Sequence, residues 1–167
     1  MMPGYSEPFH SANRKRRVLI VDDEWINREL LKKALEEEYE VLTASDGQTA
    51  MRLIRERNST LSLILLDLMM PGMHGLDVLR ALREDSDLRK IPVIVLTSDR
   101  QAEVESLKLG AVDFIPKPYP VQAVILARVT RTIELSEDRD IIRSTERDGI
   151  TGLYNRDYFS RYAQQVD

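Results

Sequence analysis

The amino-acid sequence predicts an α/β fold, a doubly wound five-stranded parallel sheet with an extended C-terminal helix. Short runs of aliphatic residues alternate with longer stretches whose apolar residues are spaced as on one face of a helix. One run, residues 61–66, is apolar at all positions but one, which is typical of a strand buried on both faces of a parallel sheet. Strands that alternate with helices form βαβ units, whose right-handed crossovers make neighbouring strands parallel.

The first half of the chain contains three predicted strands and two predicted helices. In order, these are a strand at residues 18–21, a helix at 25–37, a strand at 39–44, a helix that follows Asp46, and a strand at 61–67. The segment Ser45-Asp46-Gly47 is expected to cap the second helix, because a short acidic side chain can accept a hydrogen bond from the first helical turn.

The second half of the chain continues the alternation. In order, the predicted elements are a helix that follows Gly75, a strand at 91–96, a helix that ends at Gly110, a strand at 111–115 and a long helix at 121–144. Gly110 is expected to end its helix because glycine readily adopts the left-handed conformation found there. In the long helix, Leu135 and Ile142 lie seven residues apart, with charged residues between them. A coiled coil and a single solvated extension both remain open.

Polar residues lie at the ends of four of the predicted strands. Asp22 and Asp23 follow the first strand, Asp67 ends the third, Thr97 follows the fourth and Lys117 follows the fifth. The carboxyl ends of parallel strands meet at one edge of the sheet, where open α/β sheets place their chemistry. We therefore expect these side chains to form one site.

The chemistry of this set points to phosphoryl transfer with a metal ion. Three crowded carboxylates repel one another unless a cation lies among them, and their hard oxygen atoms favour Mg²⁺. A carboxylate beside Mg²⁺ can attack a phosphoryl group and form an acyl phosphate. The ion and Lys117 would then offset the negative charge of the transferred group, while the Thr97 hydroxyl can hydrogen-bond one of its oxygens.

Two of these positions also have a purely structural interpretation. Asp22 and Asp23 can stabilise the N-terminus of the next helix through their negative charge. Thr97 can act as the N-cap of the helix after the fourth strand, and capping there does not exclude a sensing role.

Residues 17–131 resemble the receiver domain of two-component response regulators. The matching segments are Val-Asp-Asp-Glu at 21–24, Leu-Leu-Asp-Leu-Met-Met-Pro-Gly-Met-His-Gly at 65–75, Leu-Thr-Ser at 96–98 and Lys-Pro at 117–118. The resemblance implies a flavodoxin-like sheet with strand order 2-1-3-4-5. It also implies phosphorylation by a sensor histidine kinase or a phosphotransfer protein.

The resemblance implies a role for each residue of the acidic set. Asp67 would be the phosphoacceptor. Asp22, Asp23 and Asp67 would hold Mg²⁺, with the backbone carbonyl of Met69 as a further ligand.

The resemblance also implies roles for three residues of the last strands. Thr97 would sense the phosphoryl group and Lys117 would pair with it. Phe114 falls at the position of a switch aromatic, although a buried aromatic is also a common core residue. The Lys117-Pro118 bond is expected to be cis.

A second resemblance follows the long helix. Residues 148–156, Asp-Gly-Ile-Thr-Gly-Leu-Tyr-Asn-Arg, resemble the opening of the GGDEF domain of diguanylate cyclases, with Ile150 in place of the usual Leu. The alternative to a GGDEF domain is an ordinary glycine-containing turn before a short helix. No Gly-Gly-Asp/Glu-Glu-Phe motif occurs in the chain. The expected organisation is therefore a disordered segment at 1–16, a receiver domain at 17–131, a helical linker at 132–147 and the truncated start of a GGDEF-type output domain at 148–167.

These features predict a phosphoacceptor receiver module that controls a diguanylate cyclase, whose cyclase portion is mostly absent from this chain. One alternative is a receiver that acts as a phosphorylation-dependent protein-binding switch without cyclase output. Another is a metal-dependent phosphohydrolase with Asp67 as nucleophile, although Leu68 and Met69 after it do not give the Asp-x-Asp spacing of one phosphatase class. Whether the chain is an enzyme beyond its own phosphorylation and autodephosphorylation stays open.

Composition limits the partners and the compartment. The formal net charge of −4 does not suggest DNA binding by this chain. Cysteine is absent, which excludes disulfides and thiolate metal sites and fits a cytoplasmic location. No apolar run approaches the ~20 residues of a membrane span, so no membrane partner is expected. A homodimer is expected in addition to the phosphodonor.

Overall fold

The computed structural model describes residues 16–70 and 72–147, and for residues 140–147 only the path of the backbone. The chain divides into two compact units, Met1–Thr132 and Ile133–Asp167. The first unit contains the sheet and its covering helices. The predicted disordered segment, apart from Arg16, and the GGDEF-like segment lie outside the described residues.

All the predicted strands and helices are present. In order, the elements are β1 (Arg17–Val21), α2 (Trp25–Leu35), β2 (Glu40–Ala44), α3 (Gly47–Arg57), β3 (Leu61–Asp67), α4 (Gly75–Glu84), a short 3-10 helix η1 (Leu88–Lys90), β4 (Val93–Thr97), α5 (Arg100–Lys108), β5 (Asp113–Pro116) and α6 (Gln122–Arg147). The fourth strand begins two residues later than predicted, after Pro92, which has no N–H to donate to a sheet ladder.

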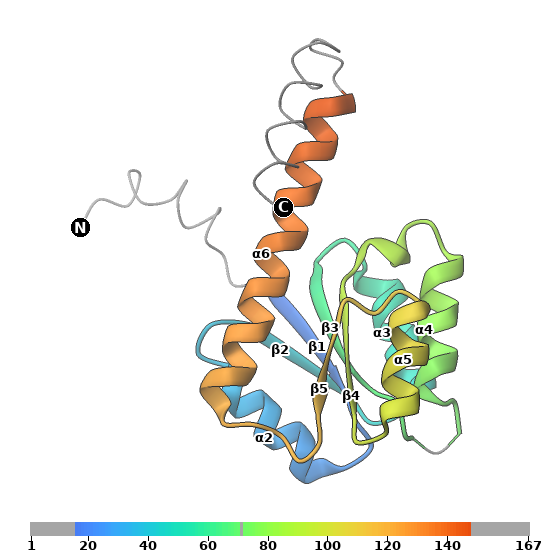
Figure 1. The fold of residues 1–167 in the computed structure, drawn as a ribbon, viewed down its shortest axis with the longest axis vertical. Coiled ribbons are helices and arrows are strands. Elements are labelled where there is room, and N and C mark those ends of the chain that lie inside the picture. The colour runs from blue at the N-terminus through green and yellow to red at the C-terminus, as the bar shows by residue number, and fades with distance from the viewer. Residues whose placement is uncertain (1–15, 71, 148–167) are drawn as a thin grey trace, which may run out of the picture. The chain divides into compact units, whose positions relative to one another are not determined.

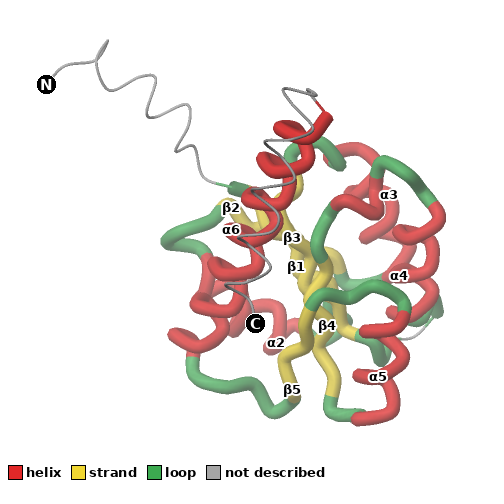
Figure 2. Tube along the Cα trace, turned by 45° about the horizontal axis from the view of Figure 1, so that its top comes forward, coloured by secondary structure: helices red, strands yellow, loops and turns green. Residues whose placement is uncertain are grey.

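The sheet is parallel throughout and has the order β2-β1-β3-β4-β5, which confirms the predicted strand order. Helices cover both faces, with α2 and the first part of α6 on one side and α3, α4 and α5 on the other (Figures 1 and 2). In the register, Val21 pairs with Leu66, Asp67 with Leu96 and Thr97 with Pro116. The carboxyl ends of the central strands therefore lie side by side.

The central strand β3 is buried on both faces, as its apolar run predicted. Four successive residues, Leu63, Ile64, Leu65 and Leu66, have no exposed surface. Burial of each such side chain contributes about 1.5–3 kcal/mol. This packing fixes the strand that carries Asp67 at its carboxyl end.

Helix α5 buries a face that its large apolar residues do not mark. Val104 and Leu107 are exposed, whereas Ala102 and Ser106 are buried. Burial of Ser106 is tolerated because its hydroxyl donates a hydrogen bond of 2.8 Å to the carbonyl of Glu103. Helical spacing thus predicted the element correctly but did not indicate which side contacts the sheet.

The first residue of α4, Gly75, approaches the backbone at the end of β3 closely. The N–H of Gly75 donates to the carbonyl of Leu68 at 3.1 Å, and the imidazole of His74 caps α4 by accepting from the N–H of Leu76 at 3.2 Å. A Cβ atom at Gly75 would overlap the backbone oxygen of Asp67 and the Cα of Leu68. The glycine therefore lets the start of α4 pack directly against the end of β3.

We predict that Gly75→Ala destabilises the chain by roughly 2 kcal/mol or more, because backbone atoms cannot move away as a flexible side chain would. Gly72→Ala is the matched control, since φ there is +75° but a Cβ would meet nothing within 4 Å. Its cost should be about 1 kcal/mol, from the left-handed conformation alone. Urea unfolding of both variants measures the difference. Equal losses would contradict the proposed contact.

Candidate functional site

Polar side chains from four strands meet at the carboxyl edge of the sheet. Asp22 follows β1, Asp67 ends β3, Thr97 ends β4 and Lys117 follows β5. Asp22, Asp67 and Thr97 are almost completely buried. The four strands that end at or just before these residues are neighbours in the sheet. The topology therefore brings together residues that are distant in the sequence.

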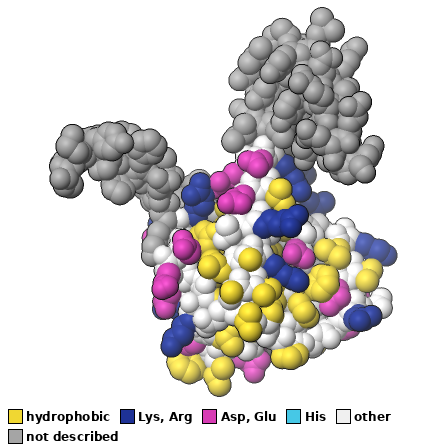
Figure 3. Space-filling view, turned by 60° about the vertical axis from the view of Figure 1, so that its left-hand side comes forward, with side chains coloured by type: hydrophobic (Ala, Val, Ile, Leu, Met, Phe, Trp, Pro, Cys, Tyr) yellow, Lys and Arg dark blue, Asp and Glu magenta, His cyan; other side chains and the backbone are white. Residues whose placement is uncertain are grey.

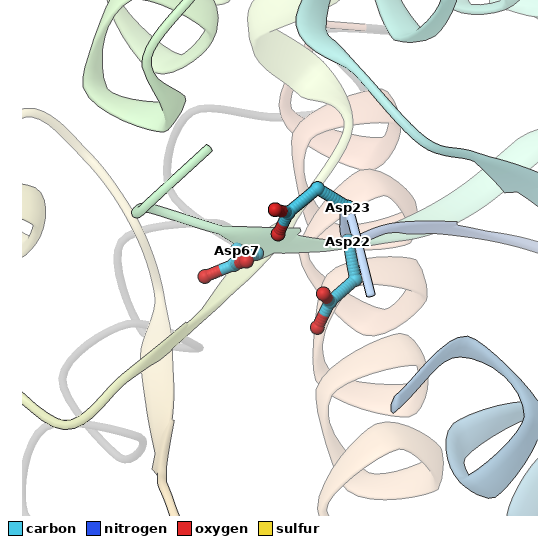
Figure 4. A group of neighbouring side chains, drawn as sticks. All are labelled: Asp22, Asp23 and Asp67. Carbon is cyan, nitrogen blue, oxygen red and sulfur yellow. The ribbon is translucent and has the colours of Figure 1, made fainter. Parts of the chain in front are cut away.

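Asp22, Asp23 and Asp67 form a cluster of carboxylates (Figure 4). Each offers one oxygen, and these oxygens lie within 4.8 Å of one another. Asp23 is exposed, whereas the other two are buried. Three hard oxygen donors at this spacing match the ligands that Mg²⁺ prefers.

The carboxylate of Asp67 has one paired oxygen and one oxygen without a partner. Oδ1 accepts hydrogen bonds from the Lys117 ammonium at 3.0 Å and from the N–H of Met69 at 3.1 Å. Oδ2 is buried and has no hydrogen-bond partner among the described residues. A buried acceptor without a hydrogen bond lowers the stability of the fold. The residues present therefore fit a cation or a transferred group at this oxygen.

Burial is the main influence on the ionisation of Asp67. It raises the pKa of the carboxyl group to about 6, against the opposing hydrogen bond and charge of Lys117. The nearby charge of Asp22 raises the pKa further. The carboxyl group is therefore ionised at neutral pH, and a cation bound next to it would lower its pKa.

Asp22 is held from several directions. Its Oδ1 accepts from the N–H of Glu24 at 2.9 Å and its Oδ2 accepts from the hydroxyl of Tyr119 at 3.1 Å. Its backbone carbonyl accepts from Arg28 at 2.7 Å. The N-cap residue of α2 is Glu24, whose own side chain makes no capping hydrogen bond, and the N–H of this residue is held by Asp22.

Tyr119 is a site residue that the sequence interpretation missed. Burial, followed by the charge of Asp22, raises the pKa of its hydroxyl well above the ordinary value. The hydroxyl therefore stays protonated and donates to Asp22. One signal in the sequence was available: Tyr119 lies two residues after Lys117, so its polar tip could be expected near the same edge.

Thr97 does not cap α5. Its Oγ1 accepts from the N–H of Asp99 at 3.0 Å, and the N-cap is Asp99, whose carboxylate accepts from the N–H of Gln101 at 2.9 Å. A hydroxyl also carries a donor. The hydroxyl of Thr97 thus keeps a proton for a further acceptor.

Phe114 lies on β5, partly buried, and packs against the main core cluster. Its carbonyl accepts a hydrogen bond of 2.7 Å from Arg128 on α6, and the same guanidinium lies 4.0 Å from the carboxylate of Asp113. The Lys117-Pro118 bond is cis, as the resemblance implied. β5 is therefore joined to the acidic site through Lys117 and to α6 through Arg128.

Comparison with known proteins decides the family. Residues 18–129 match the model of the response regulator receiver domain. The chain belongs to the receiver domain family. Receiver domains are phosphorylated by histidine kinases, so the acidic pocket is an aspartyl phosphorylation site of two-component signalling, with a donor set that suits a divalent metal ion.

Individual relatives agree with this assignment. The receiver is 39% identical over 136 residues to the response regulator PleD of Caulobacter vibrioides, covering 80% of this chain and 29% of that protein. It is 37% identical to the DNA-binding response regulator MtrA of Mycolicibacterium smegmatis, covering 74% of this chain and 53% of that protein. The chain thus spans about a third to a half of these relatives.

The fold also matches solved receivers. A putative response regulator from Chloroflexus aurantiacus superposes with a TM-score of 0.67 at 26% identity, covering 72% of this chain and 99% of that one. The signal receiver domain of a signal transduction histidine kinase from Syntrophus aciditrophicus gives a TM-score of 0.64 at 38% identity, covering 71% and 90%. Within the described residues, no helix is both long and apolar enough to span a membrane.

Proposed function

We propose that Asp67 is the phosphoacceptor of this receiver. The observation that carries the proposal is Oδ2 of Asp67, which lies buried at the carboxyl end of β3 with no hydrogen-bond partner in the described part of the chain, while Lys117 holds Oδ1. Asp22, Asp23 and Asp67, with the backbone carbonyl of Met69, would hold Mg²⁺. The mutual distances of the three carboxylates support this ligand set.

The proposed reaction transfers a phosphoryl group from a phosphohistidine donor. An oxygen of Asp67 forms a bond to phosphorus, the bond from phosphorus to the donor imidazole nitrogen breaks, and that nitrogen keeps the electron pair. Mg²⁺, when bound, neutralises part of the negative charge on the phosphoryl oxygens. Lys117 is placed to neutralise another part, because its ammonium already lies 3.0 Å from Asp67.

The exposed start of α2 supports a docking role next to the acidic pocket. Trp25 and Ile26 are 65% and 70% exposed, although both are large and apolar. Apolar side chains are interspersed with charged ones on the face shown in Figure 3. We assign the first turn of α2 to contact with a histidine kinase or phosphotransfer protein.

The signal would pass from Asp67 to α6 as a population shift. The free proton of the Thr97 hydroxyl can bond a phosphoryl oxygen, which gives the phosphorylated state a contact that the unmodified state lacks. Movement of Thr97 would displace β5, because Thr97 pairs with Pro116 in the sheet. Arg128 binds the carbonyl of Phe114, so a change at this switch aromatic would reach α6.

We predict that Asp67→Asn abolishes labelling by a small phosphodonor such as acetyl phosphate in the presence of Mg²⁺. The amide cannot form the acyl phosphate, and intact-protein mass spectrometry will show no added phosphoryl group. Asp77→Asn is the matched control, since Asp77 is exposed on α4 and forms an ion pair with Arg80 on the same helix, away from the acidic cluster. It should label as the unaltered chain does. Persistent labelling of Asp67→Asn would remove Asp67 from the role.

We further propose that the output of this receiver is a diguanylate cyclase. Residues 148–156, with their resemblance to the opening of a GGDEF domain, support this proposal. The protein-binding switch is the alternative. The coding sequence that follows residue 167 distinguishes the two by the presence or absence of a Gly-Gly-Asp/Glu-Glu-Phe motif.

The long helix α6, Gln122–Arg147, suits a role in homodimerisation. We predict that beryllofluoride with Mg²⁺, which mimics the phosphoryl group, shifts the chain from monomer toward dimer. Sedimentation velocity measures the shift, and Asp67→Asn should not respond. An unchanged sedimentation coefficient for the unaltered chain would contradict the relay through α6.

A further inference from the structure

Tyr119 makes a contact with the acidic pocket that the proposed phosphoryl transfer does not use. It lies between β5 and α6, and its hydroxyl donates to Oδ2 of Asp22 at 3.1 Å. Asp22 is completely buried, so the hydroxyl competes with little solvent for this acceptor. A phenylalanine ring could fill the same space without making the bond.

The hydroxyl completes a set of restraints on the Asp22 carboxylate. Oδ1 is already held by the N–H of Glu24. The ammonium of Lys117 lies 4.0 Å from Oδ2, beyond hydrogen-bonding distance. Among the described residues, Tyr119 is therefore the side chain that fixes Oδ2.

We propose that Tyr119 is a positioning residue that presents the Asp22 carboxylate to the divalent ion of the acidic pocket. This inference rests on the proposed function insofar as Asp22 is a ligand of that ion. A carboxylate has about four lone-pair sites, so one bond to each oxygen orients the group and leaves sites free for a metal. Hydrogen-bond partners of metal ligands commonly change metal affinity 10–100-fold when removed.

The same bond also decides how Lys117 is shared. Its ammonium is 3.0 Å from Asp67 and 4.0 Å from Asp22. While Tyr119 satisfies Oδ2 of Asp22, Lys117 stays with Asp67. Loss of the hydroxyl removes the donor to Oδ2, and of the cations in residues 16–70 and 72–139, Lys117 then lies nearest, at 4.0 Å.

Tyr119→Phe removes the hydroxyl and keeps the ring. The matched control is Tyr39→Phe, because the Tyr39 hydroxyl also makes a hydrogen bond, of 2.9 Å to Thr130, but contacts no member of the acidic cluster. Mg²⁺ alone is titrated into each variant of the full chain. The indole N–H signal of Trp25 in the NMR spectrum reports binding, since Trp25 is the sole tryptophan and lies two residues from Asp23.

The expected result is a rise in the Kd for Mg²⁺ by about tenfold in Tyr119→Phe and no change in Tyr39→Phe. An unchanged or lower Kd in Tyr119→Phe would overturn the proposal, as would an equal rise in both variants.

A second readout separates positioning from a structural role. In labelling by acetyl phosphate, the Mg²⁺ concentration that gives half the maximal rate should rise in Tyr119→Phe by the same factor as the Kd. The maximal rate at saturating Mg²⁺ should be largely recovered. A fall in the maximal rate with an unchanged half-saturating concentration would contradict positioning. If labelling persisted in Asp67→Asn, the phosphoacceptor assignment would fail while the Mg²⁺ titration would still judge Tyr119.

Discussion

The ion pair between Asp67 and Lys117 is the interaction on which the rest of the site depends. Burying an ionised carboxylate is unfavourable unless a positive group compensates it. Lys117 does so at 3.0 Å, yet burial still dominates and keeps the pKa of Asp67 raised. The pocket thus holds a carboxylate that is charged, incompletely satisfied and able to gain from a cation or a covalent partner.

The parallel sheet supplies the geometry that this interaction needs. Asp67 and Lys117 are fifty residues apart in the chain. Asp67 ends β3 and Lys117 follows β5, and only β4 lies between these two strands in the sheet. Apolar burial of β3 fixes one partner, and the ladder from β4 to β5 fixes the other. Segments that follow the sheet also contact this region. Tyr119 binds Asp22 in the pocket, and Arg128 on α6 binds the carbonyl of Phe114 on β5.

Much of the fold and most of the site could be predicted from the sequence. The apolar run of β3 and the polar residues at the strand ends were enough to predict the sheet and the site, since the carboxyl ends of parallel strands meet at one edge of the sheet. Tyr119 was missed because its partner, Asp22, is 97 residues away in the chain, and its place two residues after Lys117 was the sole local signal. The buried face of α5 was not predictable from apolar spacing, because it includes Ser106, whose hydroxyl donates a hydrogen bond to a carbonyl of the same helix.

The titration of the Asp67 carboxyl group tests the central claim most directly. Carbon-13 NMR of side-chain carboxyl groups can follow it, with the Asp67 signal identified by its loss in Asp67→Asn. In metal-free buffer the apparent pKa should be about 6, and Mg²⁺ should shift the titration to lower pH because a nearby cation favours the charged form. A pKa near the ordinary 3.8 that does not respond to Mg²⁺ would contradict the account.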